Sequence, residues 1–329
     1  MQRLAVENTE DTSLTGQPSW GTLSTMRARW LYLLAATTGL LRSPAIGAEA
    51  ATDAPTNSPP VLIAELPLQI RGQPYIRAKV AGTNELLLML DTGFGRTMLT
   101  PGIPEKLELE QRGSYKVDGI AGEEEARLFA GPKFEFGTAT FQPRRIGSTP
   151  SEARMKRRDG ILGSEFFQKF IVEIDAPGKK LRLHDPVRFE PPTNTVAISL
   201  HFRGSTPMVD ASLIVSATNT IPAQFLIDTG CTSDLCIEKD FVTKYELVPA
   251  ENGSKSTRVG AGGSVDTVTR VFTALKLGDQ EYKKPEANLF LEGEAAEAGL
   301  AGHIGYGIWH NRRIFFDYRH KKLWIVPSK

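Results

Sequence analysis

The chain has few of the side chains that build metal or disulfide sites. Its 329 residues include only two cysteines, Cys231 and Cys236, and five histidines. Neither set shows the spacing of a metal site such as His-Glu-x-x-His or paired Cys-x-x-Cys, so we expect no bound metal. A disulfide is chemically possible in an exported protein, but spacing alone leaves it open against a small buried role for Cys231. We expect surface or supporting roles for the histidines, which are His184, His201, His303, His310 and His320.

An excess of charge is also missing. Lys and Arg number 39 and Asp and Glu 38, which gives a formal net charge of +1 at pH 7. Binding to nucleic acids and other polyanions depends on an excess of positive charge. We therefore expect no nucleic-acid partner.

The apolar run near the amino terminus is too short to be a membrane span. Residues 30–41 (WLYLLAATTGLL) fall far below the roughly 20 residues that a span needs. A basic start at 26–29 and small residues at 48–50 flank this run, as is typical of a secretory signal peptide. We expect an exported protein, periplasmic or secreted; the alternative is an uncleaved signal that associates the chain with a membrane. The predicted segments are a disordered upstream extension over 1–25, the signal peptide over 26–50 and a linker over 51–60.

The remaining sequence contains two copies of one pattern. An apolar run leads into Asp91-Thr92-Gly93, and a second leads into Asp228-Thr229-Gly230, 137 residues later. Downstream, Ile161-Leu162-Gly163 corresponds to His303-Ile304-Gly305, 142 residues later. The difference of five residues predicts longer surface loops in the second copy. Further matching segments are Val172–Asp175 with Ile314–Asp317, and Lys179–Leu183 with Lys321–Ile325.

Each copy is rich in short β-branched and aromatic runs broken by Gly, Pro, Asn and Asp, which favours an all-β fold. Short helices are predicted after each triplet, at 104–107 and 238–245. We expect two homologous β-barrel-like lobes in one chain, related by an approximate twofold axis with a cleft between them. The predicted boundaries are 61–188 for the first lobe, 189–195 for the Pro-containing linker and 196–329 for the second lobe.

The repeated triplet supplies a pair of carboxylates. Twofold pairing would bring Asp91 and Asp228 face to face, where two carboxylates about 3 Å apart share one proton. Such a pair can activate a water for attack on a peptide carbonyl, with no cofactor. Backbone N–H groups at the glycines and the threonine hydroxyls would hold the pair in place, so the supporting residues are Thr92, Gly93, Thr229 and Gly230.

A Gly-rich tip follows each triplet at a similar distance. Strand-like residues flank both tips, which predicts two β-hairpins that could close over an extended peptide. The predicted flap residues are Gly119, Ile120, Ala121 and Gly122 in the first copy, and Gly260, Ala261, Gly262 and Gly263 in the second.

These motifs resemble those of the retropepsin and pepsin group of aspartic peptidases, most closely bacterial retropepsin-like proteins with two lobes fused in one chain. The resemblance covers 61–329 and rests on hydrophobic-hydrophobic-Asp-Thr-Gly at 89–93 and 226–230 and on the hydrophobic-hydrophobic-Gly at 161–163. It implies acid-protease lobes, an Asp91/Asp228 dyad and a Gly element in the loop that crosses beneath the active site. The family usually has Ala, Ser or Thr after the triplet, whereas this chain has Phe94 and Cys231.

We therefore predict a monomeric aspartic endopeptidase acting on polypeptides, with both half-sites on one chain. The departures at Phe94 and Cys231 motivate an alternative, a catalytically impaired peptide-binding module with the same fold. A structural cell-envelope protein would leave both triplets without a role.

Overall fold

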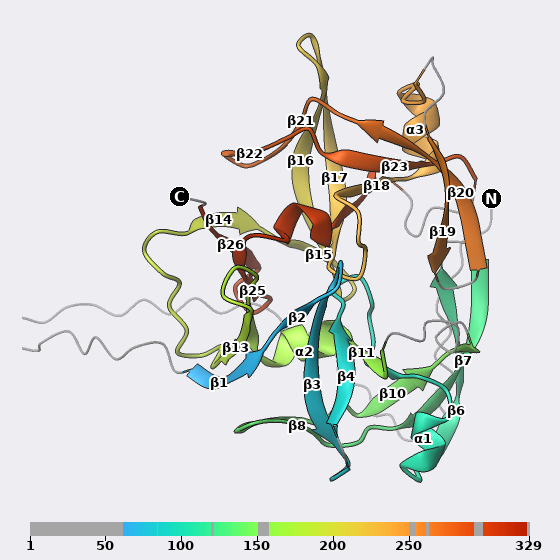
Figure 1. Ribbon diagram of the computed structural model, residues 1–329, viewed down its shortest axis with the longest axis vertical. Coiled ribbons are helices and arrows are strands. Elements are labelled where there is room, and N and C mark those ends of the chain that lie inside the picture. The colour runs from blue at the N-terminus through green and yellow to red at the C-terminus, as the bar shows by residue number, and fades with distance from the viewer. Residues whose placement is uncertain are drawn as a thin grey trace, which may run out of the picture. The chain divides into compact units, whose positions relative to one another are not determined.

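The computed structural model describes residues 62–83, 85–119, 122–150, 158–249, 254–260, 263–292 and 299–327. The segments predicted over 1–25, 26–50 and 51–60 lie outside these residues. Strands dominate the described part, and its helices are short (Figure 1). None of the described helices reaches the length and hydrophobicity of a membrane span.

In the first half of the chain, the described residues form thirteen strands and two helices. They are β1 (Leu62–Pro67), β2 (Gln69–Ile70), β3 (Pro74–Val80), β4 (Glu85–Leu90), β5 (Met98–Leu99), α1 (Ile103–Lys106), β6 (Gln111–Gly119), β7 (Gly122–Ala130), β8 (Phe134–Phe136), β9 (Ala139–Phe141), β10 (Arg145–Ser148), β11 (Gly160–Leu162), α2 (Ser164–Lys169), β12 (Ile171–Asp175) and β13 (Lys180–His184).

The second half repeats this series. It comprises β14 (Val196–Ser199), β15 (His201–Arg203), β16 (Thr206–Ser216), β17 (Asn219–Asp228), β18 (Leu235–Ile237), α3 (Lys239–Lys244), β19 (Lys255–Gly260), β20 (Gly263–Val271), β21 (Ala274–Leu277), β22 (Gln280–Lys283), β23 (Glu286–Phe290), β24 (Gly302–Gly305), the 3₁₀ helix η2 (Tyr306–Trp309), β25 (Arg313–Asp317) and β26 (Lys322–Val326). The helices α1 and α3 confirm the two predicted after the triplets, each within one residue at either end.

The two halves form ten-stranded sheets with the same strand order. One sheet runs β6-β7-β10-β5-β11-β4-β3-β8-β9, with β2 paired to β3. The other runs β19-β20-β23-β18-β24-β17-β16-β21-β22, with β15 paired to β16. Each strand of one sheet has its counterpart at the same position in the other. The prediction of an all-β fold with two homologous lobes is therefore confirmed.

A third sheet joins the halves. Its order, β1-β13-β12-β25-β26-β14, reads the same from either edge once equivalent strands are exchanged. The central pair β12 and β25 is antiparallel, with Ile174 opposite Ile314. An approximate twofold axis therefore passes between these two strands, as the sequence duplication predicts.

A buried carboxylate ties this shared sheet together. Glu173 on β12 is fully buried and accepts hydrogen bonds from Arg182, from His184 (2.7 Å) and from Arg313 (2.7 Å). Arg313 comes from the other half of the chain. A buried charge is costly unless it is paired and hydrogen-bonded, so this network offsets the cost of placing Glu173 in the core.

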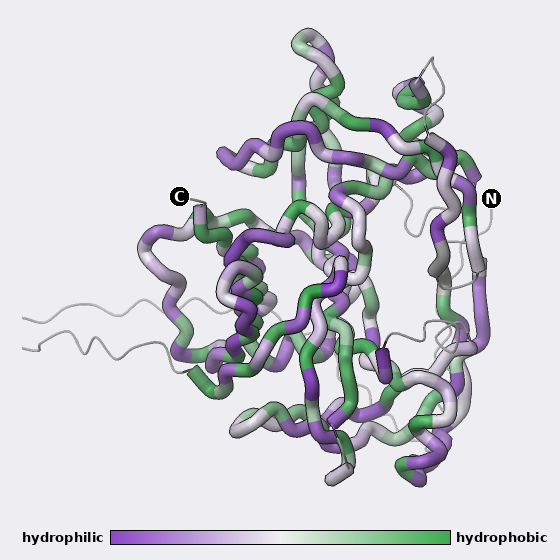
Figure 2. Tube along the Cα trace, viewed as in Figure 1, coloured by the Kyte–Doolittle hydropathy of each residue, from purple (hydrophilic) through white to green (hydrophobic). Residues whose placement is uncertain are grey.

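The triplets follow strands from the hydrophobic core. Strand β4 (ELLLML) is buried over its last four residues, and Figure 2 shows it as hydrophobic along most of its length. Strand β17 ends in the buried run Phe225, Leu226 and Ile227. A core strand that ends in a carboxylate holds that group on a rigid support. Each triplet is thus fixed by its lobe's own packing.

Candidate active site

Both Asp residues lie where a core strand ends beside a second, parallel strand. Strand β11 runs parallel to β4, and the N–H of Asp91 donates to Leu162 O at 3.0 Å. Strand β24 runs parallel to β17 in the same way, with Gly305 opposite Asp228. The duplicated sequence thus builds two equivalent strand ends.

The two threonines connect these ends through four hydrogen bonds. The N–H of Thr92 donates to Thr229 Oγ1 at 3.0 Å, and the N–H of Thr229 donates to Thr92 Oγ1 at 3.0 Å. Each hydroxyl then donates across the axis to a carbonyl, Thr92 to Ile227 O (2.7 Å) and Thr229 to Leu90 O (2.8 Å). Both threonines are almost fully buried. This network holds the two triplets together, and the role of Thr92 and Thr229 in supporting a catalytic pair stays a prediction.

The two glycines bring each triplet against the carboxylate of the other. A Cβ built on Gly230 would lie 2.3 Å from Asp91 Oδ2, and one built on Gly93 would lie 2.8 Å from Asp228 Oδ1. Both distances are too short for a real Cβ, so only glycine fits at either position. Each carboxyl group thus lies against the other triplet, and Asp91 and Asp228 are close enough that each shifts the pKa of the other.

Asp91 is the member of the pair that favours its protonated form. It is buried, and it accepts the N–H of Gly93 at 2.9 Å. Burial raises the pKa of Asp91 well above its usual range, and the negative charge of Asp228 raises it further. The positive charge of Arg158 opposes this rise only in part.

Asp228 has more donors. Its Oδ1 accepts the N–H groups of Gly230 (2.8 Å) and Cys231 (3.2 Å), and its Oδ2 lies 3.3 Å from His303 Nδ1. Burial alone would raise the pKa of Asp228, but the hydrogen bond and charge of His303 lower it below its usual value. The pair is therefore asymmetric, with more hydrogen-bond partners and the histidine on the side of Asp228.

His303 is a site residue whose role the sequence did not predict. It lies on β24, and its second nitrogen, Nε2, is 3.3 Å from Oε1 of the buried Glu238. Burial would lower the pKa of His303, but the hydrogen bonds to Asp228 and Glu238 raise it well above its usual value. One signal was available: the equivalent residue of the first copy is the apolar Ile161.

The residues after the triplets differ in what they offer the dyad. Phe94 packs against an apolar cluster of the first lobe that includes Met89 and Ile161. Cys231 donates its backbone N–H to Asp228. Neither Phe94 nor Cys231 has the side-chain hydroxyl that a Ser or Thr would offer at these two positions.

The two cysteines are free thiols in contact. Cys231 Sγ lies 3.1 Å from Cys236 Sγ. Their hydrogen bond lowers the pKa of Cys231 and raises that of Cys236 well above its usual value.

The repeated Gly turns lie against the loops that carry the triplets. A Cβ on Gly163 would lie 2.6 Å from the Arg96 carbonyl, and one on Gly305 would lie 2.1 Å from Ser233 O. The N–H of Tyr306 also donates to Cys231 O at 2.8 Å. The close approach of two backbones explains why both copies have glycine here.

Both predicted hairpins form, and their tips lie outside the described residues. Strand β6 pairs with β7 up to Gly119 and Gly122, and β19 pairs with β20 up to Gly260 and Gly263. The tip residues without a description are Ile120, Ala121, Ala261 and Gly262. The flap role of both hairpins stays a prediction.

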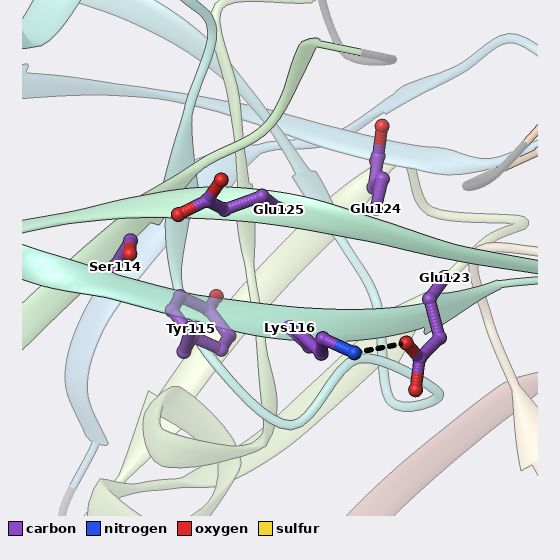
Figure 3. Close-up of a pocket in the computed structure, with 6 residues that line it drawn as sticks. All are labelled: Ser114, Tyr115, Lys116, Glu123, Glu124 and Glu125. Carbon is purple, nitrogen blue, oxygen red and sulfur yellow. Dashed lines mark hydrogen bonds and ion pairs between the residues drawn. The ribbon is translucent and has the colours of Figure 1, made fainter.

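A hollow of about 500 Å³ lies on the first hairpin, and neither Asp91 nor Asp228 lines it. Figure 3 shows its side chains on the two paired strands, where Lys116 pairs with Glu123 at 2.7 Å. The lining residues are Ser114, Tyr115, Lys116, Glu123, Glu124 and Glu125. No dyad residue is among them, so this hollow is not the candidate site.

In the ranges that the structure describes, no group of three or more His, Cys, Asp or Glu side chains is arranged to hold a metal ion.

Comparison with known proteins agrees with this geometry. Residues 76–166 match the family model described as aspartyl protease. The crystal structure of an aspartic proteinase from Irpex lacteus is similar in fold, with a TM-score of 0.54 over 81% of this chain and 97% of that one. Over residues 76–166 the chain is similar to the aspartyl protease family, and its fold is that of an aspartic proteinase. At 12% identity, the likeness to the Irpex proteinase shows the fold alone. No curated protein sequence is significantly similar to the chain.

Proposed function

We propose that this aspartic-peptidase relative is an endopeptidase that hydrolyses peptide bonds with a water activated by Asp91 and Asp228. The observation that carries the proposal is the joining of the two triplets, which places the Asp91 carboxylate against Gly230 and the Asp228 carboxylate against Gly93. A dyad of this kind offers a base and an acid at the same pH.

The chemistry needs only these two groups and water. The ionised carboxylate takes a proton from the water while the oxygen of the water attacks the carbon of the peptide carbonyl. The protonated partner gives its proton to the carbonyl oxygen, which yields a neutral tetrahedral diol. The carboxyl that gained the water proton then protonates the leaving nitrogen, while the other takes a proton back from the diol as the C–N bond breaks. The pair thus returns to its starting state.

The two hairpins are proposed to bind the substrate. The paired strands of each hairpin end at two glycines, Gly119 with Gly122 and Gly260 with Gly263, and the exposed backbone of such a hairpin can pair with an extended peptide. Since each lobe supplies one carboxylate, a monomer suffices. The signal-like segment over 26–50 supports export, to the periplasm or the medium. The lobe boundaries proposed from the sequence, 61–188 and 196–329, are compatible with a stretch over 189–195 that holds no helix or strand.

The alternative is a peptide-binding module without catalysis. Phe94 is the observation that favours it, because an apolar side chain occupies a position where the family usually has a small or hydroxyl residue.

Cleavage of denatured casein across pH 3–7 distinguishes the two proposals. We expect cleavage by the unmodified chain, and loss of at least about a thousandfold in Asp91→Asn and Asp228→Asn, because each removes one of two groups that act as a unit. A statine-type inhibitor should block cleavage of casein by the unmodified chain. Casein left intact by a protein that still binds peptides would favour the module, and unchanged cleavage in both variants would rule out the dyad.

A further inference from the structure

A line of ionisable side chains, partly buried at Asp228 and His303 and buried at Glu238, runs from the dyad into the second lobe. His303 Nδ1 lies 3.3 Å from Asp228 Oδ2, and its Nε2 lies 3.3 Å from Glu238 Oε1. The exposed fractions of the His303 and Glu238 side chains are 13% and 7%, so solvent screens these contacts weakly. The peptidase chemistry above makes no use of His303 or Glu238.

The geometry bears on the proton state of the imidazole. A neutral imidazole has one N–H and one acceptor nitrogen, whereas an ionised carboxylate only accepts. His303 has a carboxylate oxygen at each of its two nitrogens. Only the imidazolium can donate to both, so the site is built for a positive charge at His303.

The position of each partner is fixed by core structure. His303 lies opposite Leu226 on β17 and opposite Cys236 on β18. Glu238 follows β18 directly, and its N–H donates to Ala301 O at 2.9 Å, on the segment that leads into β24. Two adjacent strands therefore hold the imidazole and its carboxylate partner in register.

The first lobe has an apolar residue at the equivalent position. Ile161 stands where the second lobe has His303, and it packs with Met89 and Phe94 in an apolar cluster. An isoleucine side chain offers Asp91 neither a hydrogen bond nor a charge. The departure at His303 therefore makes a twofold site electrostatically one-sided.

The other charged and titratable groups near this line are few in the described part of the chain. The thiols of Cys231 and Cys236 are close enough for the charge of Asp228 to raise their pKa values, and His303 lowers that of Cys231. The charge of Arg258 lowers the pKa of Cys236. Across the dyad, Arg158 acts on Asp91. Among the charged side chains that the structure describes here, Asp228 and Glu238 are the two that form ion pairs with His303.

We propose that Glu238 and His303 form a positioning relay that fixes Asp228 as the ionised base of the dyad and leaves Asp91 to carry its proton. The relay rests on the proposed function, because it assigns the two roles within that dyad. Glu238 holds the imidazole in its charged form and its orientation, and the imidazolium holds the charge and orientation of Asp228. His303 is not a catalytic residue here; it acts through Asp228.

The relay predicts an asymmetric change in the pH profile of kcat/KM. The acid limb reports protonation of Asp228, and the basic limb reports loss of the proton from Asp91. A cation within about 4–6 Å lowers the pKa of a carboxyl by about 1–3 units. In His303→Gln the acid limb should therefore move to higher pH by about one unit or more. The basic limb should move in the same direction by less, because Asp91 lies farther from His303.

His184→Gln is the matched control. His184 is also a buried histidine that contacts a buried glutamate, Glu173, but it lies on β13 in the shared sheet. Its loss should affect stability without moving either limb. An acid limb in His303→Gln that stays in place, or that moves equally in His184→Gln, would overturn the relay.

A titration by NMR tests the relay without any activity. In chain labelled with ¹⁵N-histidine, His303 should keep the signals of an imidazolium, with both nitrogens protonated, to a pH well above that of an exposed histidine. Glu238→Gln should lower the pH at which these signals are lost, and it serves also if His303→Gln does not fold. A neutral His303 at about pH 6, or no response to Glu238→Gln, would overturn the relay. If His303 titrates as expected but the chain cleaves no peptide, the proposed function is refuted. The interaction of His303 with Asp228 and Glu238 would then still stand.

Discussion

Replacing Thr229 with Val should destabilise the chain by removing hydrogen bonds from the interface between the triplets. The fully buried Thr229 hydroxyl accepts the N–H of Thr92 at 3.0 Å and donates to Leu90 O at 2.8 Å. Valine has nearly the same shape, so the packing is kept while both bonds are lost. A buried N–H without a partner costs about 1–3 kcal/mol, and the lost bond to Leu90 adds about 0.5–1.5 kcal/mol. We expect the free energy of unfolding to fall by about 2–4 kcal/mol.

Urea unfolding followed by circular dichroism measures this change. Thr229→Ser is the matched control, because it keeps the hydroxyl and loses one methyl group, worth about 1 kcal/mol. Thr92→Val should cost a similar amount, since the two threonines exchange equivalent bonds. The double valine variant should cost about the sum of the two single changes, because each change removes a different pair of these hydrogen bonds. A Thr229→Val variant as stable as Thr229→Ser would refute this account of the interface.

Two further predictions concern the thiols and the buried histidine. Mild oxidation should join Cys231 and Cys236, whose sulfurs lie 3.1 Å apart, and intact-mass spectrometry should show a loss of two hydrogens that Cys236→Ser prevents; free thiols after oxidation would contradict it. Burial lowers the pKa of His303, but its bonds to Asp228 and Glu238 raise it well above the usual 6.5, so the unfolded chain loses this proton first as the pH rises. The stabilisation from the charged His303 is therefore complete below pH 6.5 and is lost as the pH rises through the raised pKa of the folded chain. Urea unfolding of the unmodified chain and of His303→Gln should show that the difference in their free energies of unfolding narrows between these two pH values. A constant difference would count against it.

The sequence was informative about everything that the duplication repeats. The triplets at 91–93 and 228–230 identify two equivalent strand ends, and a twofold arrangement of equivalent strand ends places their carboxylates together. The hairpins after the triplets and the short helices α1 and α3 could be predicted for the same reason. The repeated Asp175 and Asp317 also play equivalent parts, since each accepts a backbone N–H three residues later, from Gly178 (2.9 Å) and from His320 (3.0 Å), as is typical of Asp in turns.

The asymmetry of the site could not be predicted from motifs, because it depends on residues that the duplication does not share. His303 and Glu238 are 65 residues apart, and only the pairing of β18 with β24 brings them together. A polar residue at the position of the apolar Ile161 was the available signal, but its partner and its burial follow from tertiary packing. The shared six-stranded sheet was missed for a related reason: the β12–β25 pairing joins strands whose sequences look alike but do not indicate each other as neighbours.

A crystal structure of the chain bound to a statine-containing peptide tests the central claim most directly. The statine hydroxyl mimics the tetrahedral diol, so a working dyad should hold it between the two carboxyl groups. We expect the hydroxyl oxygen within about 3.2 Å of both Asp91 and Asp228, with the peptide extended beneath the two hairpins. A peptide that contacts one carboxyl alone, or that binds in the hollow on β6 and β7 and leaves the dyad untouched, would contradict the account.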